Sequence, residues 1–358
     1  MAENMKLDDL TTKKSEWLKG KGPESTIAIS TRVRIARNIK GHLYFSRAEE
    51  DQREKTLKAV TAGIGKSKFL KNALFLKMKD VSDLDRLFLV ERHLMSREHT
   101  LEIAHKGLAV EENEIMSVMI NEEDHIRLQV IQSGFNIMDT WRIVDEVDTE
   151  LGKYLPFDFS KKFGYLTSCP TNTGTGLRAS VMLHLTALVM TNQIEKVFDA
   201  ISKLGMTMRG FYGEGTASYG DFFQISNQVA LGHSEMDILD NLERVISKII
   251  KKEKETREEM LKHKKVNIQD RIARSKSTLE SAKVITSNET IKLLSSIRLG
   301  NDLGLVKDIS VGDINEIMLL TQPAHIQKLS GKKISPHDRD MKRADFIRDK
   351  LANITHEA

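Results

Sequence analysis

Two arginines stand two residues apart in the segment STRVRIARN at residues 30–38. If this segment is extended, Arg32 and Arg34 point to the same face, because side chains alternate along a strand. A guanidinium group keeps its charge and binds phosphate oxygens through paired hydrogen bonds. The spacing therefore suits a phosphate site, although an isolated pair of this kind is also typical of a solvated strand edge.

Three further segments each combine an arginine with carboxylates, a thiol or glycines: VMINEEDHIR at 118–127, SCPTNTGTGLR at 168–178 and RGFYGEG at 209–215. Each one alone has an ordinary structural interpretation. Residues 122–124 fit an acidic turn, the single cysteine, Cys169, fits a small buried side chain, and the glycines around Glu214 fit a loop. A catalytic interpretation requires the four segments to come together.

Two glycine patterns resemble nucleotide-binding loops. GIGKS at 63–67 is not a Walker A loop, because the position of its first glycine is Val60. GTGLRA at 174–179 matches the loose dinucleotide pattern GxGxxA and leads into a predicted helix. No parallel βαβ unit with an acidic residue about 20 positions on is evident, because the stretch that follows is apolar around residues 184–190. What remains is the expectation of a helix N-terminus whose backbone N–H groups suit a phosphate.

Together the four segments resemble the phosphagen (guanidino) kinase family over about residues 26–250. The resemblance implies an α+β fold, with an antiparallel sheet flanked by helices, and ATP with Mg²⁺ as the cofactors. It implies ATP contacts from these residues: Ser30, Thr31, Arg32, Val33, Arg34, His93, Arg127, Arg178, Ala179, Ser180, Val181, Met182, Arg209, Gly210, Phe211, Tyr212, Gly213 and Glu214. Many kinases of small guanidines have a histidine in place of Met182, so the nucleoside contact there stays open.

The same resemblance assigns the catalytic roles to Glu123, Glu214 and Cys169. A guanidinium is a poor nucleophile because its pKa exceeds about 12, so a base must take its proton while carboxylates hold its N–H groups. We favour Glu123 as the base and leave Glu214 as the alternative. A thiolate at Cys169 would help to hold the cationic substrate if an arginine and a helix N-terminus lower its pKa. No protein ligand to a metal is expected.

The layout of the chain bears on which guanidinium is phosphorylated. Only 29 residues precede Ser30, whereas kinases of free creatine or arginine carry an enclosing helical domain there, and about a hundred residues follow the catalytic region. This layout resembles the bacterial protein-arginine kinases. It implies protein substrates with exposed arginines, a role in stress response and protein quality control, a homodimer, an activator protein and a Clp-type protease ATPase as partner. A kinase of free arginine and a catalytically silent phosphoarginine-binding adaptor are the alternatives.

A further segment, RDMKRA at 339–344, follows Pro336, a plausible helix start. It resembles the element through which protein-arginine kinases bind phosphoarginine and are regulated. The resemblance implies a regulatory site made by Arg339, Asp340, Arg343 and Ala344. Without it, two arginines four residues apart indicate a solvated helix face.

These residues must be positioned by a mixture of strands and helices. Short apolar segments bounded by turn residues predict strands at 26–30, 115–120, 126–131, 163–167 and 222–226. Apolar spacings of three and four predict helices at 49–62, 82–95, 137–155, 178–190 and 193–204. Strand signals end near Met236, so we expect a leader at 1–25, a catalytic domain at 26–254 and a helical regulatory and dimerisation domain at 255–358.

Composition excludes several other classes of protein. Apolar residues make up 40% and charged residues 30%, which is typical of a soluble globular protein. The net charge of +4 gives no basic patch for nucleic acid. No apolar run approaches the roughly 20 residues of a membrane span, and the N-terminus lacks the apolar core of a secretory signal. We therefore expect a cytoplasmic protein that binds neither membranes nor nucleic acid.

Overall fold

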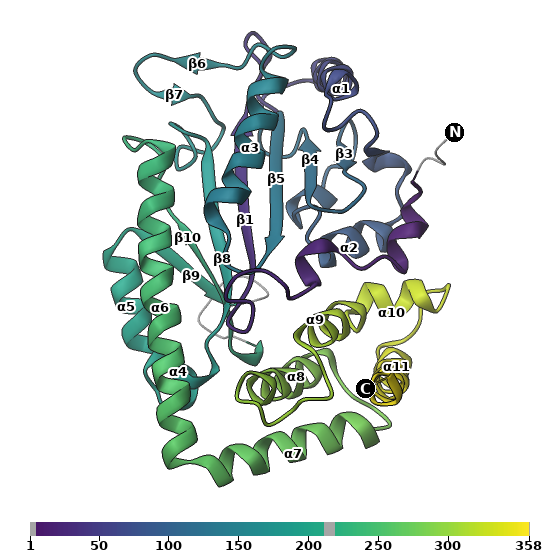
Figure 1. Cartoon of the computed structure of the whole chain (residues 1–358). Helices are drawn as coiled ribbons and strands as arrows, with labels where there is room; N and C mark the ends of the chain where they lie inside the picture. The colour runs from purple at the N-terminus through teal and green to yellow at the C-terminus, as the bar shows by residue number, and fades with distance from the viewer. Residues whose placement is uncertain (1–4, 211–218, 358) are drawn as a thin grey trace.

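An eight-stranded antiparallel sheet forms the centre of the molecule in the computed structural model, which describes residues 5–210 and 219–357 (Figure 1). The strand order is β2-β3-β4-β5-β1-β8-β10-β9. The strands are β1 (Ala28–Arg37), β2 (Leu74–Lys77), β3 (Gly107–Val110), β4 (Met116–Ile120), β5 (Ile126–Ser133), β8 (Leu177–His184), β9 (Met206–Gly210) and β10 (Phe222–Asn227). A separate hairpin pairs β6 (Phe159–Ser160) with β7 (Gly164–Tyr165). The predicted α+β fold with an antiparallel sheet is confirmed.

Helices cover one face of this sheet. They are α1 (Glu50–Lys66), α3 (Ile137–Leu151), α5 (Ile194–Lys203) and α6 (Glu235–His263); α3 packs on β1 and β5, and α6 packs on β8 and β10 (Figure 1). Their apolar side chains share a core with every second residue of the central strands, among them Val33 and Ile35 of β1. Because side chains alternate along a strand, Arg32 and Arg34 lie on the opposite face. The helical layer thus fixes the direction in which the arginines point.

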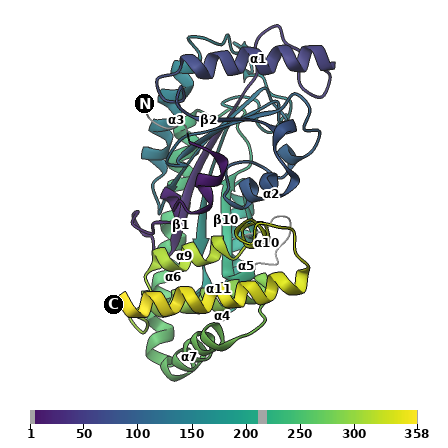
Figure 2. The ribbon, with the colours of Figure 1, turned by 90° about the vertical axis from the view of Figure 1, so that its right-hand side faces the viewer.

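Helices from the second half of the chain close one end of the open face. They are α7 (Lys265–Ser281), α8 (Ser287–Asp302), α9 (Val311–Leu320), α10 (Pro323–Leu329) and α11 (Pro336–Glu357), and Figure 2 shows them gathered at one end of the sheet. Their core includes Ile29, Ile131 and Met182 from the sheet. Two shorter helices from the first part of the chain meet this region: α2 (Asp83–Glu91) packs against α10, and Ala187 of α4 (Thr186–Met190) belongs to the same core.

The N-terminal segment takes part in the same packing. Leu10 is buried against α2, and Trp17 and Leu18, in the 3-10 helix Glu16–Leu18, belong to the core shared by the sheet and α7–α11. The division of the chain at 25/26 and 254/255 stays a prediction, and α6 runs through residue 255 as one continuous helix. No helix in the described part of the chain is long and apolar enough to cross a membrane.

Most predicted elements lie where the sequence indicated, with shifted ends. The strands at 115–120, 126–131 and 222–226 and the helices at 49–62, 82–95, 137–155 and 193–204 each match an element. The first strand begins at Ala28 and continues to Arg37, and only Gly164–Tyr165 of the segment 163–167 is a strand. Strands β2, β3, β6 and β9 are not among the predicted strands.

The predicted helix at 178–190 is wrong. Leu177–His184 is strand β8, between β1 and β10, and only Thr186–Met190 is helical. A strand buried on both faces gives an almost continuous apolar run, which periodicity cannot separate from a buried helix. The segment GTGLRA therefore leads into a strand, and the predicted helix N-terminus behind Cys169 does not exist.

Candidate active site

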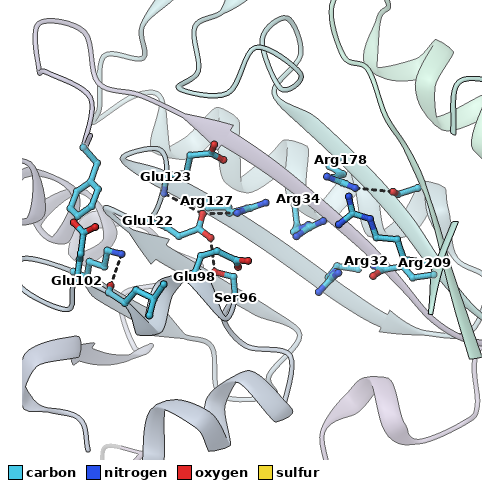
Figure 3. Close-up of a pocket in the computed structure, with 15 residues that line it drawn as sticks. Arg32, Arg34, Ser96, Glu98, Glu102, Glu122, Glu123, Arg127, Arg178 and Arg209 are labelled. Atoms are coloured by element: carbon cyan, nitrogen blue, oxygen red, sulfur yellow. Dashed lines mark hydrogen bonds and ion pairs between the residues drawn. The ribbon is translucent and has the colours of Figure 1, made fainter. Parts of the chain in front are cut away.

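Five arginines converge on the open face of the sheet (Figure 3). The strand register explains why: Arg34 pairs with Arg178 and Arg32 with Ser180 across β1 and β8, Arg127 pairs with Ala36 across β5 and β1, and Arg209 pairs with Gln224 across β9 and β10. Directly paired residues of antiparallel strands share a face. The five side chains line one cavity of about 580 Å³. Each of the four segments thus contributes at least one arginine to this cavity.

Within the described residues, Arg127 is the one arginine of this arginine cavity that forms an ion pair. Among the described residues no acceptor bonds to the guanidinium of Arg32 or Arg34, and the Nε atoms of Arg32, Arg34 and Arg178 are buried without a partner. Burial, followed by the charges of Arg127 and Arg178, lowers the pKa of Arg32 to about 10. Burial, followed by the charges of Arg32, Arg127 and Arg178, lowers the pKa of Arg34 well below its ordinary value. Buried unpaired cations are costly, so this arrangement suits a polyanion that supplies the acceptors.

Arg127 is held in place by a carboxylate that the sequence did not single out. Its Nη1 lies 2.5 Å from Oε2 of Glu122, whose Oε1 accepts a 2.5 Å hydrogen bond from Ser96. Burial alone would raise the pKa of Glu122, but the charge and hydrogen bond of Arg127 and the bond from Ser96 lower it to about 2. Glu122 is therefore an anion that orients Arg127, and Ser96 fixes Glu122.

Glu123 stands at the mouth of the same cavity and is exposed. No described cation forms an ion pair with it, so its carboxylate is available to a ligand. Loss of solvent and the charge of Asp124 raise the pKa of Glu123, against the opposing charge of Arg127. Glu214, the other predicted carboxylate, lies outside the described residues.

Cys169 lies on the loop before β8. Its Sγ is 3.0 Å from Oγ1 of Thr171. Arg178 is near enough for an electrostatic interaction with the thiol group. The loop is shaped by Gly176, whose φ is +68° and where a Cβ would come within 2.6 Å of the carbonyl oxygen of Ala36. Of the two predicted neighbours of Cys169, the arginine is therefore present, and the helix N-terminus is absent.

A second, more apolar cavity of about 620 Å³ continues from the first. The two share Arg32, Arg209 and Gln224. The second cavity is lined by His93 and Met182, both predicted ATP contacts, and by Trp17, whose ring meets that of His93 edge-on at 5.1 Å. Burial, followed by the charges of Arg32 and His325, lowers the pKa of His93 to about 3, so its ring is neutral. The first cavity is charged and the second is apolar and neutral. Together they match the phosphate end and the nucleoside end of a nucleotide.

The other predicted ATP contacts divide by the face on which they lie. Ser30, Ser180 and Gly210 line the second cavity. Four side chains point instead into the core or away from the cavities: Thr31, Val33, Ala179 and Val181. Phe211, Tyr212 and Gly213 lie outside the described residues. The structure therefore brings alternate residues of the predicted runs to the site.

Several lining residues were missed from the sequence. Gln224 and Ser226 lie on the cavity face of β10, and alternation along the predicted strand would have indicated them. Trp17 and the helical residues Met318 and Gln322 reach the second cavity through long-range packing, for which the sequence carries no local signal.

The predicted regulatory residues lie on α11, which begins at Pro336 as expected. Arg339 and Asp340 are partly exposed, whereas Arg343 and Ala344 are each 1% exposed. The guanidinium of Arg343 is bonded to Thr321, Ile285 and Asp340. Binding of phosphoarginine by this group stays a prediction.

Comparison with known proteins agrees with this geometry. The family described as "ATP:guanido phosphotransferase, C-terminal catalytic domain" matches residues 54–256, and the C-terminal domain of the protein-arginine kinase McsB matches residues 265–358. Protein-arginine kinase of Halothermothrix orenii is 46% identical over 97% of this chain and 99% of its own length. Protein-arginine kinase of Bacillus subtilis is 42% identical over 94% of this chain and 93% of its own.

Solved structures share the fold of the catalytic part. The duplicated taurocyamine kinase of Schistosoma mansoni, with bound components of a transition-state analogue, aligns with a TM-score of 0.59 at 27% identity over 64% of this chain. The alignment spans about a third, 33%, of that longer chain. Lombricine kinase aligns with a TM-score of 0.58 at 24% identity over 66% of this chain and 68% of its own. The chain therefore belongs to the protein-arginine kinase family of ATP:guanido phosphotransferases.

Proposed function

We propose that this chain transfers the γ-phosphate of ATP to the guanidinium of arginine residues in proteins. The observation that carries the proposal is the group of buried arginine N–H donors that lack an acceptor among the described residues, beside a carboxylate with a raised pKa. Full-length relatives named protein-arginine kinase support the same activity.

The two cavities suggest how ATP is held. The triphosphate lies among Arg32, Arg34, Arg127, Arg178 and Arg209, and the nucleoside lies against His93 and Met182. Guanidinium groups aimed at the phosphate oxygens neutralise charge where it develops during phosphoryl transfer, which supplies most of the catalysis in such reactions.

We assign the proton transfer to Glu123. Its carboxylate takes a proton from the substrate guanidinium, the freed nitrogen attacks the γ-phosphorus, and the bond between that phosphorus and the bridging oxygen breaks to release ADP. A raised carboxyl pKa makes Glu123 a better base. Glu214 and Cys169 are proposed to hold the guanidinium from other sides.

Mg²⁺ fits this site as a partner of the phosphates. The described residues include no group of three or more His, Cys, Asp and Glu side chains able to hold a metal ion. Mg²⁺ commonly binds with its waters and substrate phosphates instead of in a protein cage. When bound, it would neutralise phosphate charge together with the arginines.

The substrate class can be tested directly. The chain is incubated with Mg-ATP and either an unfolded casein-like protein or free arginine, and products are detected by mass spectrometry under conditions that preserve P–N bonds. We expect acid-labile phosphate on protein arginines, lost in Glu123→Gln. Phosphate on serine or threonine alone would refute the proposal, and faster turnover of free arginine would identify a small-guanidine kinase. An adaptor without catalysis would give no product in either arm.

We extend the proposal to the biological setting that the family resemblance implies. The chain acts in the cytoplasm, marks proteins in stress response and quality control, and forms a homodimer through α7–α11. An activator protein and a Clp-type protease ATPase are its proposed partners, and the domain boundaries are proposed at 25/26 and 254/255.

A further inference from the structure

We propose that Arg343 is a positioning residue for nucleotide binding, because it fixes the wall that the C-terminal helices give to the nucleoside cavity. The inference rests on the proposed function, in which this cavity receives the nucleoside of ATP. It assigns to a buried arginine of α11 a role in the basal reaction, separate from any binding of phosphoarginine.

One side of the nucleoside cavity is built by the helical part of the chain. Its lining residues come from the start of α8 and from the α9–α10 junction: Ser287, Asn288, Met318, Leu319, Gln322 and Pro323. These two segments are far apart in sequence, and they face residues of the sheet and of the turn after α2 across the cavity, among them Met182 and His93. The width of the cavity therefore depends on how the two segments are held relative to one another.

Arg343 bonds to both segments at once. Its Nε donates to the carbonyl oxygen of Thr321 at 2.7 Å, and its Nη1 donates to the carbonyl oxygen of Ile285 at 2.8 Å. Thr321 directly precedes Gln322, and Ile285 directly precedes Thr286, the N-cap of α8. Asp340 pairs with the same guanidinium. A planar guanidinium has donors in a fixed fork, so it sets the spacing of the two carbonyl groups.

The opposite end of this wall is anchored to the catalytic part. The carboxylate of Glu91, the last residue of α2, accepts hydrogen bonds from the backbone N–H groups of Ala324 and His325 at 2.8 and 3.0 Å. Glu91 itself lines the nucleoside cavity. The wall is thus fixed to α2 on one side and to α11 on the other. Loss of the α11 anchor frees the start of α8 and the residues around Gln322.

This geometry predicts that a change of Arg343 lowers the affinity of the nucleoside cavity and leaves that of the arginine cavity unchanged. The phosphate arginines lie on β1, β5, β8 and β9, whose register does not involve α11. Arg343→Lys keeps the charge, but a single ammonium group cannot reproduce the fork to two carbonyl groups. We expect the Kd of ATP to rise about tenfold in Arg343→Lys, with the Kd of inorganic tripolyphosphate unchanged.

The experiment titrates ATP and tripolyphosphate into the full chain and into two variants. The matched control is Arg348→Lys, because Arg348 lies on the same helix and donates to the carbonyl oxygen of Ala282, outside the cavity lining. Thermal unfolding of each variant measures any general loss of stability. We expect Arg348→Lys to bind both ligands as the unchanged chain does.

The outcomes separate this inference from the proposed function. If the unchanged chain binds ATP and Arg343→Lys binds it equally well, the inference is wrong and the proposed function stands. An equal loss of ATP and tripolyphosphate affinity in Arg343→Lys would also overturn it, since that pattern indicates a general structural role. If the unchanged chain binds neither ligand, the proposed nucleotide site itself fails.

Discussion

Glu123 and Glu98 stand in the same cavity and are both exposed, but only Glu123 is assigned a proton transfer. We expect Glu123→Gln to lower kcat by about 10²- to 10⁴-fold, the usual contribution of a general base, with the affinity for ATP unchanged. Glu98→Gln serves as the control and should keep most of the activity. Steady-state kinetics with a protein substrate measures both. A loss in Glu123→Gln no larger than in Glu98→Gln would contradict the assignment.

The pH dependence of the same residue follows from its raised pKa. A base acts in its deprotonated form, so kcat should fall as the pH decreases through the pKa of Glu123. Because that pKa is raised, the acid limb should lie above the ordinary carboxyl value of 4.5. The limb should be absent from the residual activity of Glu123→Gln.

At the residue scale the sequence predicted the charged groups of the cavity well, but it did not predict the residues that hold these groups in place. Arg32 and Arg34 were found because alternation along a strand is a local property. Glu122 and Ser96 were missed because their importance comes from one hydrogen-bond chain to Arg127, which forms only when β4, β5 and the segment after α2 meet.

Strand β1 shows how one element separates two kinds of arginine. Arg34 points into the arginine cavity without a protein acceptor among the described residues, whereas Arg37 points to the opposite face. The guanidinium of Arg37 pairs with Asp148 and donates to the carbonyl oxygens of Ala36 and Thr175 at 2.9 and 2.8 Å. The first arginine is available to a ligand, and the second is part of the fold.

This contrast predicts opposite effects on stability. Arg34→Met removes a partly buried charge that has no acceptor among the described residues, so the free energy of unfolding of the ligand-free protein should rise while ATP binding weakens at least about tenfold. Arg37→Met leaves Asp148 buried without its partner and should lower the free energy of unfolding by about 3–5 kcal/mol. Urea unfolding and ATP titration of both variants test this. Shifts of stability in the same direction would refute it.

The element predicted least well was β8. Its residues alternate between the cavity face, with Arg178, Ser180 and Met182, and the core face, with Ala179 and Val181. Because Met182 is itself apolar and buried, this alternation is weak in the sequence. The pairing of β8 with β1 and β10 decides the structure, and pairing partners are not readable from a single segment.

At the scale of the whole molecule, buried histidines join the helical and catalytic parts. His184 of β8 meets Oγ of Ser295 in α8 through Nε2 at 2.8 Å and Arg257 of α6 through Nδ1 at 3.3 Å. His325 of α10 meets Glu91 of α2. The sequence could not predict these contacts, since each joins residues more than 70 positions apart.

Acid should therefore weaken the molecule, at this joint through His184 and in the sheet part through His93 and His99. Burial, with the charges of Arg257, Arg298 and Arg271, lowers the pKa of His184 well below its ordinary value of 6.5, and burial lowers those of His93 and His99 to about 3 and about 4. Below pH 6.5 the unfolded chain binds protons that the folded chain does not, so stability falls as the pH falls. Three such histidines together predict a loss of about 3 kcal/mol between pH 6.5 and 5.5.

Urea unfolding across this pH range measures the loss, and hydrogen exchange locates it. We expect α8 to lose protection before β1 and β5, because His184 contacts α8 directly. In His184→Gln the loss of stability per pH unit should be smaller by one histidine's share, whereas His233→Gln, at an exposed position, should leave it unchanged. If the stability of His184→Gln keeps the full pH dependence, folding does not lower the pKa of His184. The joint between sheet and helices is then not the acid-sensitive part.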